Sequence, residues 1–185
     1  MMENLVIHPR DPTTVFLTPI YEKVANKTVI AQEVDPDSLK DLIKQSNRVM
    51  AMGHGSSNGL FSINLFSEWD RLSFFAVGDD DADLLRDKDQ SIYIWCHANQ
   101  FVDFHDLKGF YSGMFISEVT EAIFCGLRNI NQKIVDESNK VFSEAVGDNI
   151  ELSKEDLYEK VVVEYGALAK SNPVALYNLE RICIR

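Results

Sequence analysis

Short apolar runs alternate with segments of helical periodicity along the first two thirds of the chain. Runs rich in apolar and β-branched residues, each followed by a polar or turn residue, predict buried strands. They lie at residues 5–8, 28–31, 48–53, 91–95 and 113–117. Because parallel strands need crossover connections, this alternation predicts an α/β fold. We expect a mostly parallel sheet between two layers of helices, a three-layer α/β/α sandwich.

Polar residues followed by proline mark where several predicted helices begin. Asp11 and Asp35 are each a candidate N-cap with proline at the first helical position. In the first of these helices, Pro19 implies a kink or a later start. The aspartates of residues 79–83 suit the first turn of another helix because they complement its dipole. A calcium loop is disfavoured, since an EF-hand requires a different spacing of acceptors and a glycine at its sixth position.

Residues 129–185 differ from the rest of the chain because helical spacing continues throughout. Ser153 and Asp156 stand at capping-box positions, and the segment predicts two or three amphipathic helices. No internal repeat or flexible linker divides the sequence. We therefore expect one domain, residues 1–185, with a core of sheet and helices in 1–128 and a helical C-terminal part in 129–185.

Acidic side chains outnumber basic ones, 29 against 18, and the formal net charge is −11. This charge repels phosphate backbones, so nucleic-acid binding is not expected. No apolar run is long enough for a membrane span and the start lacks a signal-peptide pattern, which predicts a cytoplasmic protein. The three cysteines are too scattered for a disulfide framework or a thiolate zinc site. We interpret Cys125 and Cys183 as small buried hydrophobes.

Three reactive side chains directly follow or end predicted strands, namely His8, His54 and Cys96. The carboxyl ends of parallel strands meet at one edge of a sheet, so these side chains should lie near the same rim. An imidazole can take the proton of a thiol, and the thiolate is the nucleophile of acyl transfer. The sequence therefore predicts a His54–Cys96 dyad. Residues 59–64 predict part of a small hairpin over this edge, which can serve as a lid.

Backbone N–H groups beside the predicted dyad can complete a site for acyl transfer. Gly55 has no β-carbon, so its N–H can approach a substrate carbonyl closely. The N–H of Cys96 is a second donor. Together they predict an oxyanion hole, which stabilises the charge that develops during attack on an amide.

An apolar strand ending in His-Gly (VMAMGHG) and a later one ending in Cys (SIYIWCHA) resemble the core of the clan CD cysteine peptidases. These are the caspase, legumain, gingipain and bacterial CHAT-domain families, in which the histidine follows the third core strand and the cysteine the fourth. The resemblance covers about residues 5–117. It implies a caspase-like fold, a thiol protease that hydrolyses peptides without a cofactor, dyad roles for His54 and Cys96, and an oxyanion role for Gly55. The caspase motif Gln-Ala-Cys is replaced by Ile-Trp-Cys, which argues against a true caspase.

Further residues near the predicted strand ends are candidates for substrate binding. Arg10 can bind a carboxylate. Trp95 puts a bulky ring beside the nucleophile, and Glu118 would make a pocket acidic and favour a basic substrate residue. His97 is a rival base for Cys96, but its position directly after the cysteine is expected to turn its side chain elsewhere. The full candidate set is Arg10, Ser56, Trp95, His97, Ser112 and Glu118.

Three other interpretations start from the same residues. His8, His54 and Asp11 form a histidine-and-carboxylate set suited to zinc or iron, although Asp11 is more simply a helix cap. A caspase-like module that no longer cuts would act as a sensor or protein-binding partner through the same crevice. A flavodoxin-like ligand-binding domain needs a phosphate-binding loop after the first strand, and the sequence has none there.

Overall fold

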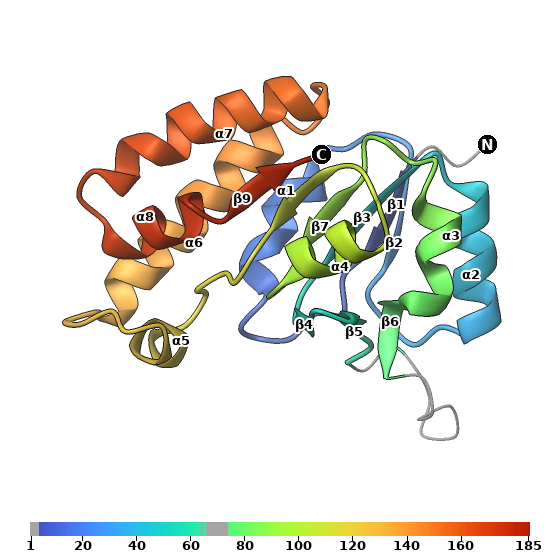
Figure 1. Cartoon of the computed structure of the whole chain (residues 1–185), viewed down its shortest axis with the longest axis horizontal. Coiled ribbons are helices and arrows are strands. Elements are labelled where there is room, and N and C mark those ends of the chain that lie inside the picture. Colours follow the sequence, from blue (N-terminus) through green and yellow to red (C-terminus); the bar gives the residue numbers. More distant parts are fainter. Residues whose placement is uncertain (1–3, 64, 66–73) are drawn as a thin grey trace.

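A six-stranded sheet forms the centre of the computed structural model, which describes residues 4–63, 65 and 74–185 (Figure 1). The strand order is β2-β1-β3-β7-β8-β9. All neighbouring pairs are parallel except β8 and β9. The predicted α/β class with a mostly parallel sheet is therefore confirmed. The strands are β1 (Asn4–Ile7), β2 (Lys27–Ile30), β3 (Arg48–Met52), β7 (Ile92–Ile94), β8 (Phe110–Ser112) and β9 (Ile182–Ile184).

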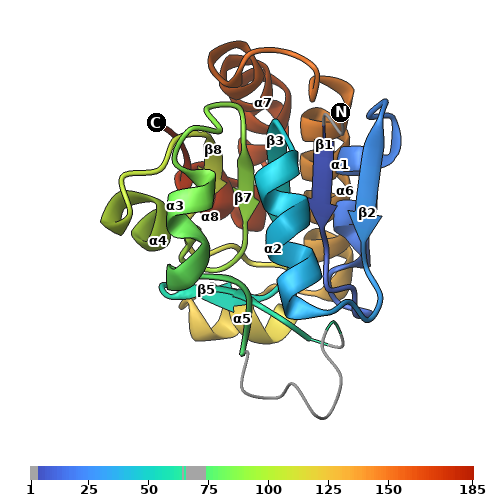
Figure 2. The same cartoon turned by 90° about the vertical axis from the view of Figure 1, so that its right-hand side faces the viewer.

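Helices cover both faces of this sheet, as Figures 1 and 2 show. Successive strand residues point to opposite faces, so both faces carry apolar side chains. Met50 and Met52 of β3 belong to the core under α1, α6 and α7, whereas Val49 and Ala51 belong to the core under α2, α3 and α4. The first layer contains α1 (Thr18–Glu22), α6 (Gln132–Asp148) and α7 (Lys154–Ala169), and the second contains α2 (Pro36–Gln45), α3 (Ala82–Leu85) and α4 (Ala98–Phe104).

A second, antiparallel sheet lies below the carboxyl ends of the parallel strands (Figures 1 and 2). It consists of β4 (Gly55–Ser56), β5 (Gly59–Phe61) and β6 (Phe75–Gly78). The predicted hairpin corresponds to β4 and β5, and residue 64 of the predicted segment lies outside the described residues. Strand β6 was not predicted. The N–H of Phe61 donates to the carbonyl oxygen of His54 at 2.9 Å, which ties this small sheet to the end of β3.

The strand after Cys96 begins earlier than predicted. It is β8, Phe110–Ser112, and residues 113–117 lie outside any strand. The turn before it depends on Gly109 at φ +147°, where a β-carbon would lie 2.3 Å from the carbonyl oxygen of Ser91. Phe115 and Ile116 of the predicted strand are buried, but against helices: Phe115 packs on Phe142 of α6. The apolar pattern of residues 113–117 therefore reflects burial against helices and not a strand of the sheet.

The C-terminal part contains three helices, as predicted, and one strand that was not predicted. After α6 and α7 come α8 (Pro173–Leu179) and β9, which pairs antiparallel with β8 and covers its edge. The predicted cap at Ser153 is confirmed, since its hydroxyl accepts a hydrogen bond from the N–H of Asp156 at 3.1 Å. Among the described residues, no helix has the length and apolar composition that a bilayer span requires.

The helix starts agree with the prediction at Asp35 and differ at Asp11. Asp35 accepts a hydrogen bond from the N–H of Ser38 at 2.8 Å and caps α2. Asp11 caps no helix: its carboxylate accepts from the N–H of Thr13 at 2.7 Å, and α1 begins only at Thr18 after the short 3-10 turn η1 (Val15–Leu17). The later start follows from Pro19 in the first turn of α1. The aspartates form another 3-10 turn, η3 (Asp79–Asp81), that leads into α3.

Helices α1 and α6 approach each other closely at Gly147. We expect Gly147→Ala to destabilise the protein by about 1–3 kcal/mol, because a β-carbon there would lie 2.5 Å from the backbone oxygen of Pro19. Gly166→Ala in α7 is the matched control. Its nearest neighbour would be Leu179 Cδ2 at 3.5 Å, so the better helix propensity of alanine should stabilise by about 0.5–1 kcal/mol. Urea unfolding of both variants measures this difference; equal effects would contradict the close approach.

Candidate active site

Loops that follow four parallel strands meet around a small cavity of about 20 Å³. They follow β1, β3, β7 and β8, so the cavity lies at the carboxyl edge of the sheet. His54 and Cys96 both line it, although they come from separate strands. A cavity of this size is near the space that one water molecule occupies. The lining residues are Thr14, Phe16, Leu17, Gly53, His54, Ile94, Trp95, Cys96, Phe115 and Ser117.

The His54 ring is held by the loop that follows β1. Its Nε2 lies 3.0 Å from Oδ2 of Asp11 and 2.7 Å from the hydroxyl oxygen of Thr13. The Thr13 hydroxyl donates its single proton to Oδ1 of Asp11 at 2.6 Å, so it must accept from Nε2 of His54. This arrangement fixes the neutral tautomer with the proton on Nε2 and leaves Nδ1 as the basic nitrogen. Within the described part of the chain, Nδ1 makes no hydrogen bond.

Asp11 is suited to hold the ring because its carboxylate stays ionised. Burial by itself raises the pKa of Asp11, but hydrogen bonds from the hydroxyl and N–H of Thr13, together with the nearby His54, lower it overall. The carboxylate therefore accepts hydrogen bonds at neutral pH. An ionised acceptor at Nε2 also favours the protonated ring that forms when Nδ1 takes a proton.

The Cys96 thiol is protonated in this structure. Burial raises its pKa to about 11, and the carboxylate of Glu121 acts in the same direction. Its Sγ is 3.6 Å from the carbonyl oxygen of Phe115, to which it donates a weak hydrogen bond. Among the described residues, no hydrogen bond joins Cys96 to His54. The two side chains therefore share a cavity without forming an ion pair.

Trp95 links the loop of Cys96 to the loop of His54. The residue is 1% exposed, and its ring packs edge-on against Tyr93 and Phe101. Its indole N–H donates to the carbonyl oxygen of Ser56 at 3.0 Å. A β-carbon on Gly55 would lie 2.3 Å from Cδ1 of the indole, so the contact requires glycine there. The ring that was predicted as a substrate contact is a core side chain that holds the two loops together.

Arg10 and His97, two of the predicted substrate-binding residues, are both exposed. Arg10 forms no hydrogen bond or ion pair with the residues that the structure describes, which leaves its guanidinium available to a ligand. His97 has φ +67°, a left-handed conformation in which histidine is enriched, and α4 begins at the next residue. Its ring lies 3.4 Å from the side-chain nitrogen of Gln100. Neither Arg10 nor His97 is among the residues that line the cavity.

Ser56, Ser112 and Glu118 are not among the residues that line the cavity. Ser112 is 1% exposed, and its hydroxyl donates to the carbonyl oxygen of Trp95 at 3.0 Å. The hydroxyl of Ser56 accepts from the N–H of Asn58 at 3.2 Å in the turn of the hairpin. Glu118 precedes α5 (Val119–Phe124) and donates its N–H to Glu121. The acidic group that acts on the Cys96 thiol is therefore Glu121, which the sequence did not single out.

His8 lies in the core and is turned toward α1. Its Nδ1 is 3.0 Å from the hydroxyl of Tyr21, and its buried Nε2 has no partner among the described residues. Burial, followed by the charge of Arg10, lowers the pKa of His8 to about 4, so the ring is neutral near pH 7. No three His, Cys, Asp or Glu side chains in the described ranges form a group that could hold a metal ion. The alternative of a His8–His54–Asp11 metal site is therefore not supported.

The contacts of Asp11 and Thr13 with His54 were not predicted. Asp11 was weighed as a metal ligand beside His8 and His54 and preferred as a helix cap, and Thr13 was not considered, yet both contact the His54 ring. A signal was present, because their loop follows a strand and should end at the same sheet edge as His54. What periodicity could not supply was the position of β1 directly beside β3.

No family model, curated protein or solved structure matches this chain.

The pH dependence of thiol alkylation tests the environment of Cys96. Cys125 and Cys183, predicted to be small buried hydrophobes, are half-buried, so both are first replaced by serine. Iodoacetamide should then label Cys96 at a rate that rises about tenfold per pH unit from pH 7 to pH 10, because only the thiolate reacts and the pKa is about 11. A rate that levels off below pH 9 would show that the thiol is not held in its protonated form.

Proposed function

We propose that the protein is a cysteine hydrolase of peptide bonds that uses His54 and Cys96 as a dyad. The observation that carries this proposal is the oriented His54 ring, with Nε2 held by Asp11 and Thr13, beside a thiol at the end of the neighbouring strand. The positions of His54 after β3 and of Cys96 after β7 also agree with the clan CD resemblance, in which the two residues follow the third and fourth core strands.

The tautomer of His54 defines its part in the reaction. Nδ1 accepts the proton of the Cys96 thiol as Sγ attacks the substrate carbonyl carbon, and the oxyanion is held by the N–H groups of Gly55 and Cys96. The resulting imidazolium is stabilised by Asp11 and then protonates the leaving amine as the C–N bond breaks. Water attacks the thioester that remains, returns its proton through His54, and releases the acid and the thiol.

The resting geometry implies that substrate binding must open this site. The cavity is too small for a peptide. The Cys96 thiol donates a hydrogen bond to the carbonyl oxygen of Phe115, and its pKa is raised to about 11. In our proposal, a substrate displaces the loop that carries Phe115, widens the cavity and lets the thiol turn toward Nδ1 of His54. Apo sites often have long or absent catalytic hydrogen bonds that form only in the complex.

The second candidate function is a non-catalytic sensor or protein-binding module with the same fold. The state of Cys96 favours this second function. The thiol is protonated and donates a hydrogen bond to the carbonyl oxygen of Phe115, and a thiol in this state is a poor nucleophile. Under either function the partner is a peptide or a protein. The net charge of −11 disfavours nucleic acid, and three free cysteines agree with a reducing cytoplasmic location.

A peptide-library digest analysed by mass spectrometry tests the hydrolase directly. Cys96→Ala should reduce cleavage by about 1,000-fold or more, because no other group on the cavity replaces the nucleophile. The control is Cys125→Ala, a half-buried cysteine that does not line the cavity, which should cleave like the parent. Equal cleavage by the parent and Cys96→Ala would contradict the proposed role of Cys96 as the nucleophile of a hydrolase. A parent protein that neither cleaves the library nor reacts with an electrophilic thiol probe would support the binding module.

Asp11→Asn tests how the ring is oriented. An asparagine amide can donate to Nε2 and so favour the tautomer that carries its proton on Nδ1, which should lower kcat about 100-fold with little change in KM. Thr13→Ser keeps the hydroxyl, so its kcat should stay near that of the parent. Thr13→Val removes the hydroxyl and should lower kcat about tenfold. Asp41→Asn, an exposed carboxylate on α2, is the control. A kcat for Asp11→Asn equal to that of Asp41→Asn would remove Asp11 from the mechanism.

A further inference from the structure

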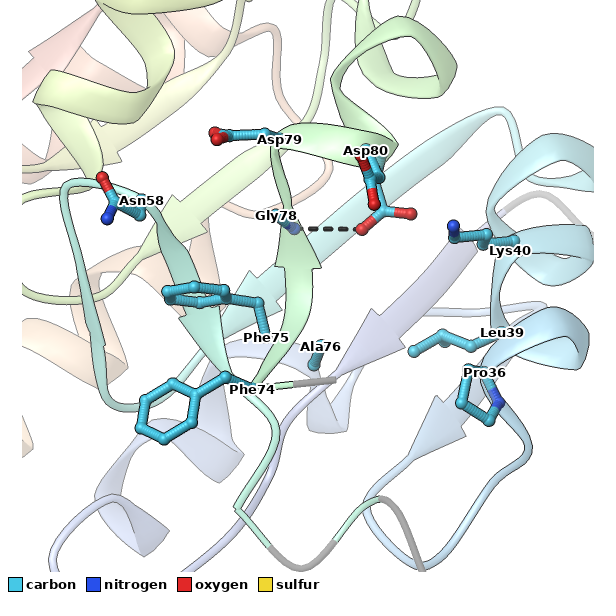
Figure 3. Close-up of a pocket in the computed structure, with 11 residues that line it drawn as sticks. Pro36, Leu39, Lys40, Asn58, Phe74, Phe75, Ala76, Gly78, Asp79 and Asp80 are labelled. Carbon is cyan, nitrogen blue, oxygen red and sulfur yellow. Dashed lines mark hydrogen bonds between the residues drawn. The ribbon is translucent and has the colours of Figure 1, made fainter. Parts of the chain in front are cut away.

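A larger cavity, of about 380 Å³, lies between α2 and the turn from β6 into η3 (Figure 3). Its volume is in the range of small-molecule binding sites, unlike that of the cavity at the dyad. The described residues that line it are Pro36, Leu39, Lys40, Asn58, Phe74, Phe75, Ala76, Gly78, Asp79, Asp80 and Asp81. This cavity and the small cavity at His54 and Cys96 share no lining residue.

Acidic side chains dominate the charge of this cavity. Three consecutive aspartates face a single lysine, Lys40. Oδ1 of Asp79 lies 2.9 Å from Nε2 of His105, whereas Asp80 and Lys40 form no ion pair with the residues that the structure describes. The cavity therefore has a net negative charge, which favours a cation over an anion.

Asp81 has a carboxylate oxygen without a hydrogen-bond partner among the described residues, which favours binding of a ligand beside it. The residue is 6% exposed, and its Oδ2 accepts a hydrogen bond from the N–H of Gly78 at 3.0 Å, drawn as the dashed line in Figure 3. Its Oδ1 is buried and has no hydrogen-bond partner among the residues that the structure describes. Leaving a buried carboxylate oxygen unpaired costs several times more than an ordinary hydrogen bond gains. A donor that entered the cavity would supply the missing partner.

The rest of the wall is apolar and aromatic. Figure 3 shows the rings of Phe74 and Phe75 on one side and the side chains of Leu39 and Pro36 on the other. Phe74 is 68% exposed, so its ring is accessible from solvent. Ring faces attract cations through their quadrupole and also pack against apolar groups. The wall thus suits a ligand with an apolar body.

We propose that this cavity binds a small organic cation, a primary ammonium or guanidinium group on an apolar chain or ring. The cationic head lies near the carboxylates of Asp80 and Asp81, which both line the cavity. The apolar body lies between Phe75 and Leu39. A metal ion is the poorer occupant: although three aspartates line the cavity, no group of three His, Cys, Asp or Glu side chains in the described residues is arranged so that it could hold a metal ion.

Isothermal titration of the full chain with 2-phenylethylamine tests the charge preference. The comparison ligand is 3-phenylpropanoate, which has a similar ring and chain but carries a carboxylate. We expect the amine to bind at least tenfold more tightly, because Asp80 and Asp81 attract it and repel the carboxylate. Equal affinities, or tighter binding of the carboxylate, would overturn the proposal.

Three substitutions then locate the amine. Asp81→Asn keeps an acceptor for the N–H of Gly78 but removes the charge, and should weaken binding about tenfold or more. Asp80→Asn changes an exposed side chain, so it preserves the fold and should weaken binding severalfold. Lys40→Met removes the repelling charge and should strengthen binding severalfold. The control is Asp83→Asn, an exposed carboxylate paired with Arg86 at 2.8 Å outside the cavity, which should bind like the parent.

Two results in this series would contradict the proposal. One is equal affinity of Asp80→Asn and Asp83→Asn for the amine, and the other is weaker binding by Lys40→Met. The inference does not depend on the proposed hydrolase, and one further variant separates the two. Cys96→Ala should bind 2-phenylethylamine as the parent does, whether or not the parent cleaves any peptide.

Discussion

The contact between the Trp95 indole and Gly55 is the constraint on which the candidate site depends. Trp95 directly precedes Cys96, and Gly55 directly follows His54, so this one contact sets the distance between the two loops. A β-carbon at position 55 would lie 2.3 Å from the indole, and the indole N–H is tied to the carbonyl oxygen of Ser56. The ring itself is clamped by Tyr93 and Phe101 in the core. The positions of His54 and Cys96 are thus fixed by core packing and not by an interaction between the two.

The two halves of the dyad differ in how well they are prepared for chemistry. The His54 side is organised: two acceptors hold Nε2, and Nδ1 remains as the base. The Cys96 side is not, because burial keeps the thiol protonated and Phe115 takes its hydrogen bond. In the proposed hydrolase only one element would have to move, the segment after β8, which carries Phe115 and lies outside any regular strand. Under that proposal the thiolate would form only after a ligand has entered the site.

Periodicity predicted the parts of the fold in which buried strands alternate with helices. The strands that end before His54 and Cys96 were found because both faces of the sheet are covered, so their residues are continuously apolar. The same signal failed for residues 113–117, since Phe115 and its neighbours are buried by helices instead. Strand β9 was missed because three residues are too short for a pattern and its pairing with β8 is long-range. Asp11 and Thr13 were missed because their role depends on the position of β1 beside β3, which a one-dimensional pattern does not contain.

His8 makes the core sensitive to acid at the base of the loop that orients His54. Its pKa is about 4 in the folded protein against 6.5 for a solvated histidine. The unfolded chain therefore binds a proton between these values that the folded chain does not, so the stabilisation is complete above about pH 6.5 and declines as the pH falls toward 4. The loss reaches about 3 kcal/mol, a large share of the stability of a typical domain. Mild acidification therefore destabilises the fold while the folded His8 ring stays neutral; the ring takes a charge, three residues before Asp11, only near pH 4, where that carboxylate is still largely ionised.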